Sequence, residues 1–292
     1  MKKLLITGAK GQVGQELTQQ ANFHSFKPIP LSRADLDISD YDQVDQTVND
    51  IKPDIIINAA AFTNVDLAET KQEQALACNK EGPDNLAVTA AKLNIPLFHI
   101  STDFIFDGEK NTPYIEDDDP NPLSFYGESK LLGEEAVWTV WDKHIILRVS
   151  WVFGQYGHNF FSGVADWAKN KKELQIVSDQ VGGPTPANAV AETLLVLAAK
   201  SIEQNNSFYW GTYHYSGLPA VSRFEYTQFI VSELKKMGVE NLANLVPVPA
   251  SHYPMPAQRP AYSALDSGLL ERNFGIKAPD WQEGARELIK IK

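Results

Sequence analysis

The sequence LLITGAKGQVG, residues 4–14, decides the fold of this chain. Its first four residues form a short apolar run that predicts a buried strand. Apolar residues at spacings of four then predict a helix: Val13, Leu17 and Ala21. Three glycines make up the connection: Gly8, Gly11 and Gly14. We therefore expect a strand, a tight glycine-rich turn and a helix.

The glycine-rich turn has the composition of a phosphate-binding loop. Glycine permits positive φ angles and lets backbone N–H groups approach a pyrophosphate, whose charge the helix dipole favours. The alternative is a tight turn without a ligand, but a position at the start of a series of strands and helices favours a dinucleotide site. Cofactor contacts are expected from the residues of the turn: Gly8, Lys10, Gly11, Gln12, Val13 and Gly14.

Strand and helix patterns alternate through the first half of the chain. Apolar runs predict one strand that ends near residue 31 and further strands at residues 54–58, 95–100 and 144–152. Helical patterns separate them at residues 41–51, 76–93 and 124–138. Such alternation predicts an α/β fold with right-handed βαβ units and a doubly wound parallel sheet of the Rossmann type.

The pattern changes near residue 151, where glycine and proline punctuate shorter elements. Helices are predicted at residues 189–200 and 224–237. We therefore expect an NAD(P)-binding domain over residues 1–150 and a smaller, mainly substrate-binding domain over residues 151–292, with segments of the two interleaved.

Composition narrows the classes of function. The chain has 292 residues, 43% hydrophobic and 22% charged, which is typical of a globular protein with a substantial core. Its 37 acidic and 26 basic residues give a net charge of -11, so we expect neither nucleic acid nor an anionic membrane as a partner. Cys78 is the only cysteine and has no disulfide partner, which suits a reducing compartment. No apolar run approaches the length of a membrane span, and we expect a cytoplasmic protein.

The end of the second predicted strand bears on the choice between NAD and NADP. NAD sites usually carry an acidic residue there, about 20 residues after the glycine turn, whereas this chain has Ser32 and Arg33. An arginine can neutralise a 2′-phosphate, so the sequence favours NADP (NADPH), although NAD stays open. The alternative interpretation of Arg33 is a solvated loop residue that binds no cofactor. Further cofactor contacts are expected near the adenine and after the next strand: Asp37, Ile38, Ala59, Ala60 and Ala61.

Tyr126 and Lys130 lie four residues apart and hence on one face of a predicted helix. A tyrosine has a pKa of about 10, and a cation beside it lowers that pKa towards neutral pH, where a general acid works best. Thr102 ends another predicted strand and can hold a carbonyl oxygen as negative charge develops on it. These three residues are the predicted catalytic set. The alternative is a core tyrosine, a solvated lysine and a buried strand-end hydroxyl.

Together these motifs resemble the extended short-chain dehydrogenase/reductase family and, within it, the dTDP-4-dehydrorhamnose reductases. The narrower resemblance rests on motifs spread over nearly the whole chain: residues 11–14 (GQVG), 35–38 (DLDI), 61–66 (AFTNVD), 151–154 (WVFG), 179–185 (DQVGGPT) and 259–265 (RPAYSAL). It implies NADPH-dependent reduction of the C4 keto group of dTDP-4-dehydro-6-deoxy-L-mannose to dTDP-L-rhamnose. That reaction is the last step of a pathway that serves cell-surface polysaccharides.

The resemblance also implies roles for single residues. Tyr126 protonates the alkoxide, and Lys130 binds the nicotinamide ribose and lowers the pKa of Tyr126. Arg259 meets the substrate diphosphate, bidentate where geometry allows. The other implied substrate contacts are Thr63, Val65, Thr102, Asp103, Phe104, Tyr126 and Trp151. Magnesium and a homodimer are implied by the resemblance alone, because the sequence offers no independent set of metal ligands.

Other functions on this fold stay open at this point. By the same resemblance, a 4,6-dehydratase carries a glutamate directly after the Thr-Asp pair, where this chain has Phe104. The motif at residues 179–185 argues against a 4-epimerase. A non-catalytic NAD(P)-binding regulatory subunit is the alternative from another class, and the retention of the three predicted catalytic residues favours an enzyme.

Overall fold

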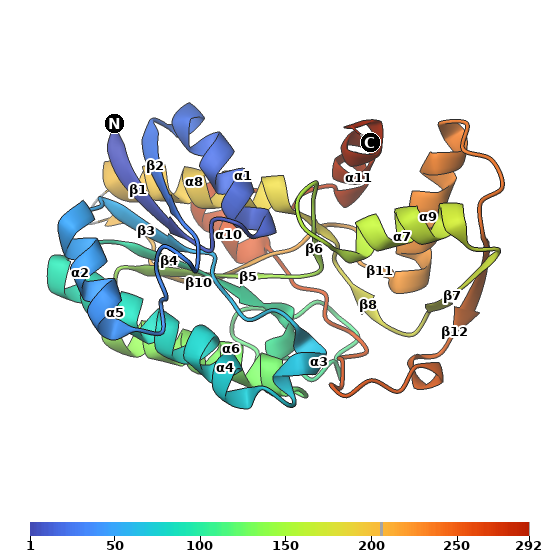
Figure 1. Ribbon diagram of the computed structural model, residues 1–292, viewed down its shortest axis with the longest axis horizontal. Coiled ribbons are helices and arrows are strands. Elements are labelled where there is room, and N and C mark those ends of the chain that lie inside the picture. Colours follow the sequence, from blue (N-terminus) through green and yellow to red (C-terminus); the bar gives the residue numbers. More distant parts are fainter. Residues whose placement is uncertain (205–206, 292) are drawn as a thin grey trace.

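The computed structural model describes residues 1–204 and 207–291. Its largest feature is a six-stranded sheet, on the left of Figure 1, in which every neighbouring pair of strands is parallel. From edge to edge the strands are β10 (Gly211–Tyr215), β5 (His144–Val149), β4 (Leu97–Thr102), β3 (Ile55–Asn58), β1 (Lys2–Thr7) and β2 (Phe26–Leu31).

Helices cover both faces of this sheet (Figure 1). One face packs against α1 (Gln12–Gln20), α8 (Ala187–Gln204) and α10 (Gly268–Phe274). The other face packs against α2 (Tyr41–Ile51), α5 (Gly82–Leu93) and α6 (Phe125–Val140). Because both faces are buried, the strands are nearly continuous apolar runs, as in IIIN for β3 and HIILRV for β5. The doubly wound parallel sheet predicted from the sequence is confirmed.

The chain changes sides of the sheet between β2 and β3. The strand β2 pairs on one side of β1, whereas β3, β4 and β5 follow in order on the other side. In open α/β sheets, ligands bind outside the carboxyl ends of the strands at such a switch point. The glycine turn after β1 and the small residues after β3 both lie at this edge.

A smaller layer lies on the right of Figure 1. Its helices α7 (Phe160–Asn170), α9 (Arg223–Lys236) and α11 (Trp281–Ile291) enclose a second core rich in aromatic residues. Its strands pair in twos: β7 (Glu173–Val177) with β12 (Asn244–Val248), β8 (Val181–Gly182) with β11 (Val221–Ser222), and β6 (Val152–Phe153) with β9 (Thr185–Pro186). Although they follow residue 150, α8, β10 and α10 pack with the large sheet.

Two predicted elements differ in the structure. The strand predicted over residues 144–152 ends at Val149, because Trp151 has a φ of +45°, which interrupts extended backbone. The helix predicted over residues 76–93 is interrupted: a π-helical turn, Ala77–Glu81, joins α4 (Gln72–Leu76) to α5. The short helix α3 (Val65–Ala68) precedes it. Three-residue or four-residue 3₁₀ turns occur at Ala21–His24, Asp103–Ile105 and Ala250–His252.

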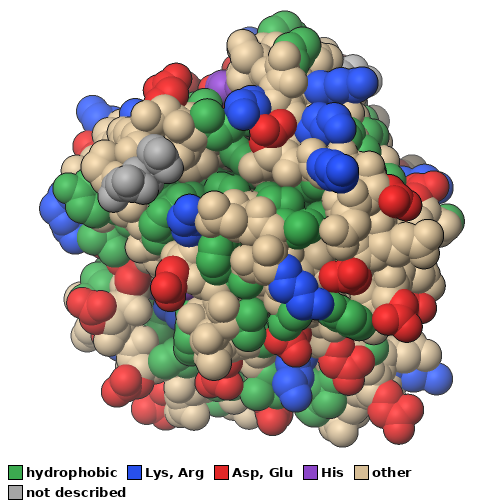
Figure 2. All heavy atoms as spheres, turned by 90° about the vertical axis from the view of Figure 1, so that its left-hand side faces the viewer, with side chains coloured by type: hydrophobic (Ala, Val, Ile, Leu, Met, Phe, Trp, Pro, Cys, Tyr) green, Lys and Arg blue, Asp and Glu red, His purple; other side chains and the backbone are tan. Residues whose placement is uncertain are grey.

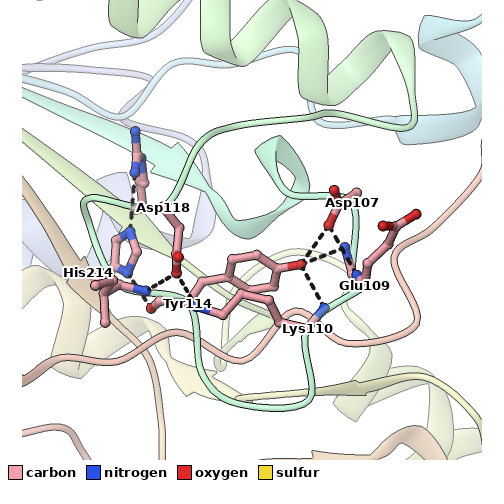
Figure 3. Close-up of polar contacts among 9 residues, drawn as sticks. Asp107, Glu109, Lys110, Tyr114, Asp118 and His214 are labelled. Atoms are coloured by element: carbon pink, nitrogen blue, oxygen red, sulfur yellow. Dashed lines mark hydrogen bonds and ion pairs between the residues drawn. The ribbon is translucent and has the colours of Figure 1, made fainter.

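The loop between β4 and α6 is tied to the edge strand β10 (Figure 3). The Tyr114 hydroxyl donates to Asp107 (2.7 Å), and the Tyr114 carbonyl oxygen accepts from His214 Nδ1 (3.0 Å). Burial lowers the pKa of His214 to about 3, so the ring is neutral and its Nε2 accepts from Arg148 (3.3 Å). Arg148 also forms a buried ion pair with Glu134 on α6 (2.7 Å). This network fixes the position of α6 against the sheet.

The surface carries charges of both signs. Figure 2 shows the face that lies on the left of Figure 1, where acidic and basic side chains are interspersed. None of the helices in the described ranges has the length and apolar character that crossing a membrane requires.

Candidate active site

A cavity of about 1230 Å³ lies at the carboxyl ends of β1, β3 and β4, and both layers line it. Pockets for a single small ligand typically measure about 300–1,000 Å³, so this cavity is larger than a single small ligand requires. Every site residue predicted from the sequence lines it except Gly14. The fold thus gathers the glycine turn, the Tyr126–Lys130 pair and Trp151 around one space.

The glycine turn is packed too closely for larger residues. Gly8 has a φ of +65°, and a Cβ atom there would lie 2.5 Å from the Ala59 carbonyl oxygen. Gly14 does not line the cavity, and its contact with the cofactor stays a prediction. Its Cβ would lie 2.2 Å from the Gly8 carbonyl oxygen, so it allows α1 to pack on the turn. The helix α1 begins after Gly11 with no side-chain cap and no acidic residue in its first turn, which leaves its N–H groups for an anion.

The side chains that bear on NAD or NADP lie beside this turn. The Ser32 N–H and hydroxyl both donate to Asp35 (2.9 and 2.6 Å). Arg33 is 83% exposed, and the one ion pair it forms with a described residue is a long contact of 3.6 Å to Asp37. A hydrogen bond from Ser39 is the main cause that lowers the pKa of Asp37. Since an exposed pair of this kind is weak, Arg33 can exchange Asp37 for a phosphate group.

Tyr126 lies in the first turn of α6, which begins after the capping residue Ser124. Burial raises the pKa of Tyr126 to about 12, against a hydrogen bond with Thr102 that lowers it. The phenol is therefore protonated at neutral pH. Such a group acts as a proton donor towards a strong base, such as an alkoxide that forms within the cavity.

The Lys130 side chain points towards β4. Its Nζ lies 2.7 Å from the Ile100 carbonyl oxygen and 3.2 Å from His99 Nε2. Burial lowers the pKa of Lys130 to about 8, and Glu134 opposes this effect. Burial dominates the pKa of the Tyr126 phenol, and the expected lowering of that pKa by Lys130 stays a prediction.

Arg223, at the start of α9, is a cavity residue that the sequence analysis missed. Its guanidinium stacks on the Trp151 indole, with Cζ 3.4 Å from the ring centroid, and also faces Phe160 at 4.8 Å. The indole has room because residue 182 is glycine, where a Cβ would lie 2.5 Å from the ring. Burial lowers the pKa of Arg223 to about 10, so it stays a cation at neutral pH. No local pattern distinguishes Arg223 from a surface helix residue, and only its packing on Trp151 reveals it.

Arg259 lines the cavity, but its guanidinium is engaged by the protein itself. Its Nη1 and Nη2 donate to the two carboxylate oxygens of Asp66 (3.0 and 2.7 Å), which is a bidentate ion pair. This pair is the main cause that lowers the pKa of Asp66. Asp66 takes the paired donors of Arg259 in this arrangement, and the contact between Arg259 and a diphosphate stays a prediction.

Comparison with known proteins decides the family. A family model described as the RmlD substrate binding domain matches residues 1–292. A curated dTDP-4-dehydrorhamnose reductase from Aggregatibacter actinomycetemcomitans is 39% identical over 99% of this chain and 98% of the relative. The chain belongs to the dTDP-4-dehydrorhamnose reductase family.

Solved structures of this reductase family have the same fold over their whole length. A dTDP-4-dehydrorhamnose reductase from Clostridium acetobutylicum has a TM-score of 0.91 and 36% identity, with 99% of each chain covered. One from Bacillus anthracis, in complex with NADP, has a TM-score of 0.90 and 34% identity, covering 100% of this chain and 99% of the other. A dTDP-glucose 4,6-dehydratase from Streptomyces venezuelae is only 18% identical at a TM-score of 0.79, so that likeness shows the fold alone.

The surroundings of Tyr126 agree with membership of the reductase family. Phe104 meets the Tyr126 ring edge-on, with 5.7 Å between centroids, so an apolar ring stands where a dehydratase is expected to carry its glutamate. Asn79, missed by the sequence analysis, supports this wall from the π-helical turn. Its side chain accepts from the Phe62 N–H (2.7 Å) and donates to the Ser129 hydroxyl on α6 (2.9 Å). No local sequence signal marked Asn79, because residues 76–93 predict an uninterrupted helix.

Residues 1–204 and 207–291 lack a cluster of metal ligands. They contain no group of three or more His, Cys, Asp or Glu side chains that could hold a metal ion. The magnesium implied by resemblance thus gains no ligand set from this part of the chain.

Proposed function

We propose that this protein uses NADPH to reduce the C4 keto group of dTDP-4-dehydro-6-deoxy-L-mannose, which gives dTDP-L-rhamnose. The observation that carries the proposal is Tyr126, a buried and protonated phenol beside Thr102 in a cavity lined by both layers. Curated relatives that are named dTDP-4-dehydrorhamnose reductase support the choice of substrate.

The residues around the glycine turn fit a dinucleotide. The uncapped N-terminus of α1 and the close approach of Gly8 to Ala59 form a backbone cradle suited to a pyrophosphate. Arg33 favours NADPH over NADH, because its guanidinium can meet a 2′-phosphate, and the Bacillus anthracis relative contains NADP. When bound, the reduced nicotinamide supplies the hydride for the keto carbon.

Thr102 and Tyr126 act on the oxygen of the keto group. The Thr102 hydroxyl donates a hydrogen bond to this oxygen as its negative charge grows. The Tyr126 O–H bond then breaks and its proton passes to the oxygen, which leaves a phenolate that water later reprotonates. Because burial disfavours this phenolate, a nearby cation lowers the barrier. Lys130 in its protonated form is the group that supplies it.

The smaller layer and the adjoining loops hold the substrate. Trp151 flanks the sugar, and Arg223, stacked on its indole, supplies positive charge for the diphosphate. Arg259 adds to this local field even while it is paired with Asp66. Arg223 and Arg259 supply positive charge within the cavity, so a chain with a net charge of -11 can still bind two anionic ligands. The remaining proposed contacts are Thr63, Val65, Asp103 and Phe104, all at the cavity wall.

The decisive experiment supplies the purified protein with NADPH and dTDP-4-dehydro-6-deoxy-L-mannose. We expect loss of NADPH absorbance and formation of dTDP-L-rhamnose. In Tyr126→Phe, kcat should fall by about 10²- to 10⁴-fold, with NADPH binding retained. Tyr209→Phe is the matched control, because Tyr209 is 59% exposed and should keep wild-type turnover. NADPH binding without any turnover would contradict the proposal and indicate a regulatory subunit.

Two related points are tested in the same way. Turnover measured with dTDP- and GDP-linked 4-keto sugars, side by side, decides which nucleotide the site prefers, and we expect dTDP. A homodimer and a cytoplasmic location stay predictions from the sequence and its family resemblance. Light scattering of the purified protein measures the first of these.

A further inference from the structure

His99 lies beneath Lys130 and has no part in the mechanism above. Its ring is fully buried on β4, between Asn58 on β3 and Lys130 on α6. His99 Nδ1 lies 3.0 Å from Asn58 Nδ2, and His99 Nε2 lies 3.2 Å from Lys130 Nζ. Both neighbours carry N–H groups, whereas a neutral imidazole can accept at only one nitrogen. One of the two neighbours must therefore accept a hydrogen bond from the ring.

The backbone fixes the orientation of the Asn58 amide. The Ala60 N–H donates to Asn58 Oδ1 (3.1 Å), and the Thr7 hydroxyl donates to the same oxygen (2.6 Å). A backbone N–H can only donate, so the amide atom that it faces is the oxygen, and the atom that faces His99 is the NH₂ group. This group donates to His99 Nδ1, which therefore carries no proton.

A neutral His99 then carries its proton on Nε2, directed at Lys130. An Nε2–H group cannot accept from an ammonium, but a neutral amine offers a lone pair to it and can still donate to the Ile100 carbonyl oxygen (2.7 Å). We propose that His99 is a positioning residue: Asn58 holds it in the Nε2–H tautomer, and in this tautomer it donates to Lys130 and favours the neutral amine.

The titratable groups around the pair agree with this assignment. Burial holds the pKa of His99 well below its usual value, so the ring is neutral, and it lowers the pKa of Lys130 to about 8. Glu134 favours the charged form of Lys130, but its carboxylate is paired with Arg148 (2.7 Å). The other titratable neighbours are Cys78, beside Lys130, and His144, beside His99. Lys130 can thus change charge near neutral pH, and the tautomer of His99 biases that change.

This inference deepens the proposed function and rests on it for its catalytic consequence. The phenolate of Tyr126 needs the cationic form of Lys130, so activity falls as the pH rises through the pKa of Lys130. A His99 ring that donates to Lys130 lowers this pKa and moves the fall to lower pH. A ring that accepts from Lys130 raises the pKa and moves the fall to higher pH.

The first test reads the tautomer directly, in protein without added nucleotide. Nitrogen-15 NMR of the histidine rings at about pH 9, one unit above the Lys130 pKa of about 8, reports which ring nitrogen is protonated. The chain has six histidines, and His99→Gln assigns the relevant ring by its missing signals. We expect a protonated Nε2 and a bare Nδ1. A proton on Nδ1 would overturn the proposal whatever reaction the enzyme catalyses.

The second test reverses the contact with Asn58. In Asn58→Asp, a carboxylate keeps its contacts with Ala60 and Thr7 but accepts from Nδ1 instead of donating to it. We expect Nδ1 to become protonated and the basic limb of kcat/KM to move up by about one pH unit or more. The control is Thr7→Val, which removes a contact of the same oxygen while Ala60 keeps the amide in place, so the proton should stay on Nε2.

Two results of the second test would refute the proposal: a bare Nδ1 in Asn58→Asp, or a moved ring proton in Thr7→Val. Failure of the proposed function would appear separately, as absence of turnover in the wild-type assay. The ring spectra would not be affected by it.

Discussion

Gly8→Ala is the substitution whose cost can be worked out most fully from the structure. A residue with a side chain at a φ of +65° costs about 1–2 kcal/mol in backbone strain. The new methyl would also lie 2.5 Å from both the Ala59 carbonyl oxygen and the Ala60 nitrogen. These are backbone atoms at the end of β3, so relief requires the turn to shift, and overpacking of this kind costs about 1–3 kcal/mol more. We expect Gly8→Ala to lower the free energy of unfolding by about 2–5 kcal/mol.

Gly275→Ala separates the cost of backbone strain from the cost of steric overlap. Gly275 follows α10 with a φ of +73°, but a Cβ there meets nothing within 4 Å. This control therefore incurs only the backbone strain, about 1–2 kcal/mol. Urea denaturation of both variants gives the difference, which should be the steric cost at Gly8.

The shift of the turn should also weaken cofactor binding. A fluorescence titration with NADPH should show a raised Kd for Gly8→Ala and a wild-type Kd for Gly275→Ala. Equal losses of stability in the two variants, or unchanged NADPH affinity in Gly8→Ala, would refute the reasoning about the packed turn.

Two further predictions concern ion pairs, one exposed and one buried. In Arg33→Ala, kcat/KM for NADPH should fall by about 10- to 100-fold, which is the contribution of a charge-assisted hydrogen bond. The kcat/KM for NADH and the free energy of unfolding should stay unchanged, because the ion pair with Asp37 is exposed. Equal losses of kcat/KM with both cofactors would contradict this role. In Arg148→Met, the buried carboxylate of Glu134 loses its partner, and the free energy of unfolding should fall by about 3–5 kcal/mol in chemical denaturation. The double variant Arg148→Met/Glu134→Leu should recover most of that loss, and a double variant as unstable as the single one would show that the lost charge pairing is not the cause.

The parts of the site that could be predicted from the sequence are those encoded in short windows. A positive φ at Gly8 and the four-residue spacing of Tyr126 and Lys130 depend on neighbouring residues alone. For this reason the turn and the Tyr126–Lys130 pair lie at the cavity as expected. Gly14 illustrates the limit: its place in the motif was clear, but whether it faces a ligand or the turn depends on how α1 packs.

The sequence did not indicate contacts between residues that lie far apart in the chain. Arg259 pairs with Asp66, which stands 193 positions away. The strand predicted to end at residue 152 ends at Val149, because Trp151 turns out of the sheet to stack with Arg223. Neither contact leaves a periodic signal in the local sequence.

By itself, then, the sequence determined the order of strands and helices, the glycine-rich turn after β1 and the side chains proposed for catalysis. These depend on local backbone preferences and on hydrophobic periodicity, which act over a few residues. The tertiary structure decided the charge states within the site. Burial raises the pKa of Tyr126 and lowers that of Lys130, and the hydrogen bonds from β1 and β3 fix the tautomer of His99. Desolvation and hydrogen bonding act between groups brought together only by folding, so no reading of neighbouring residues could have supplied them.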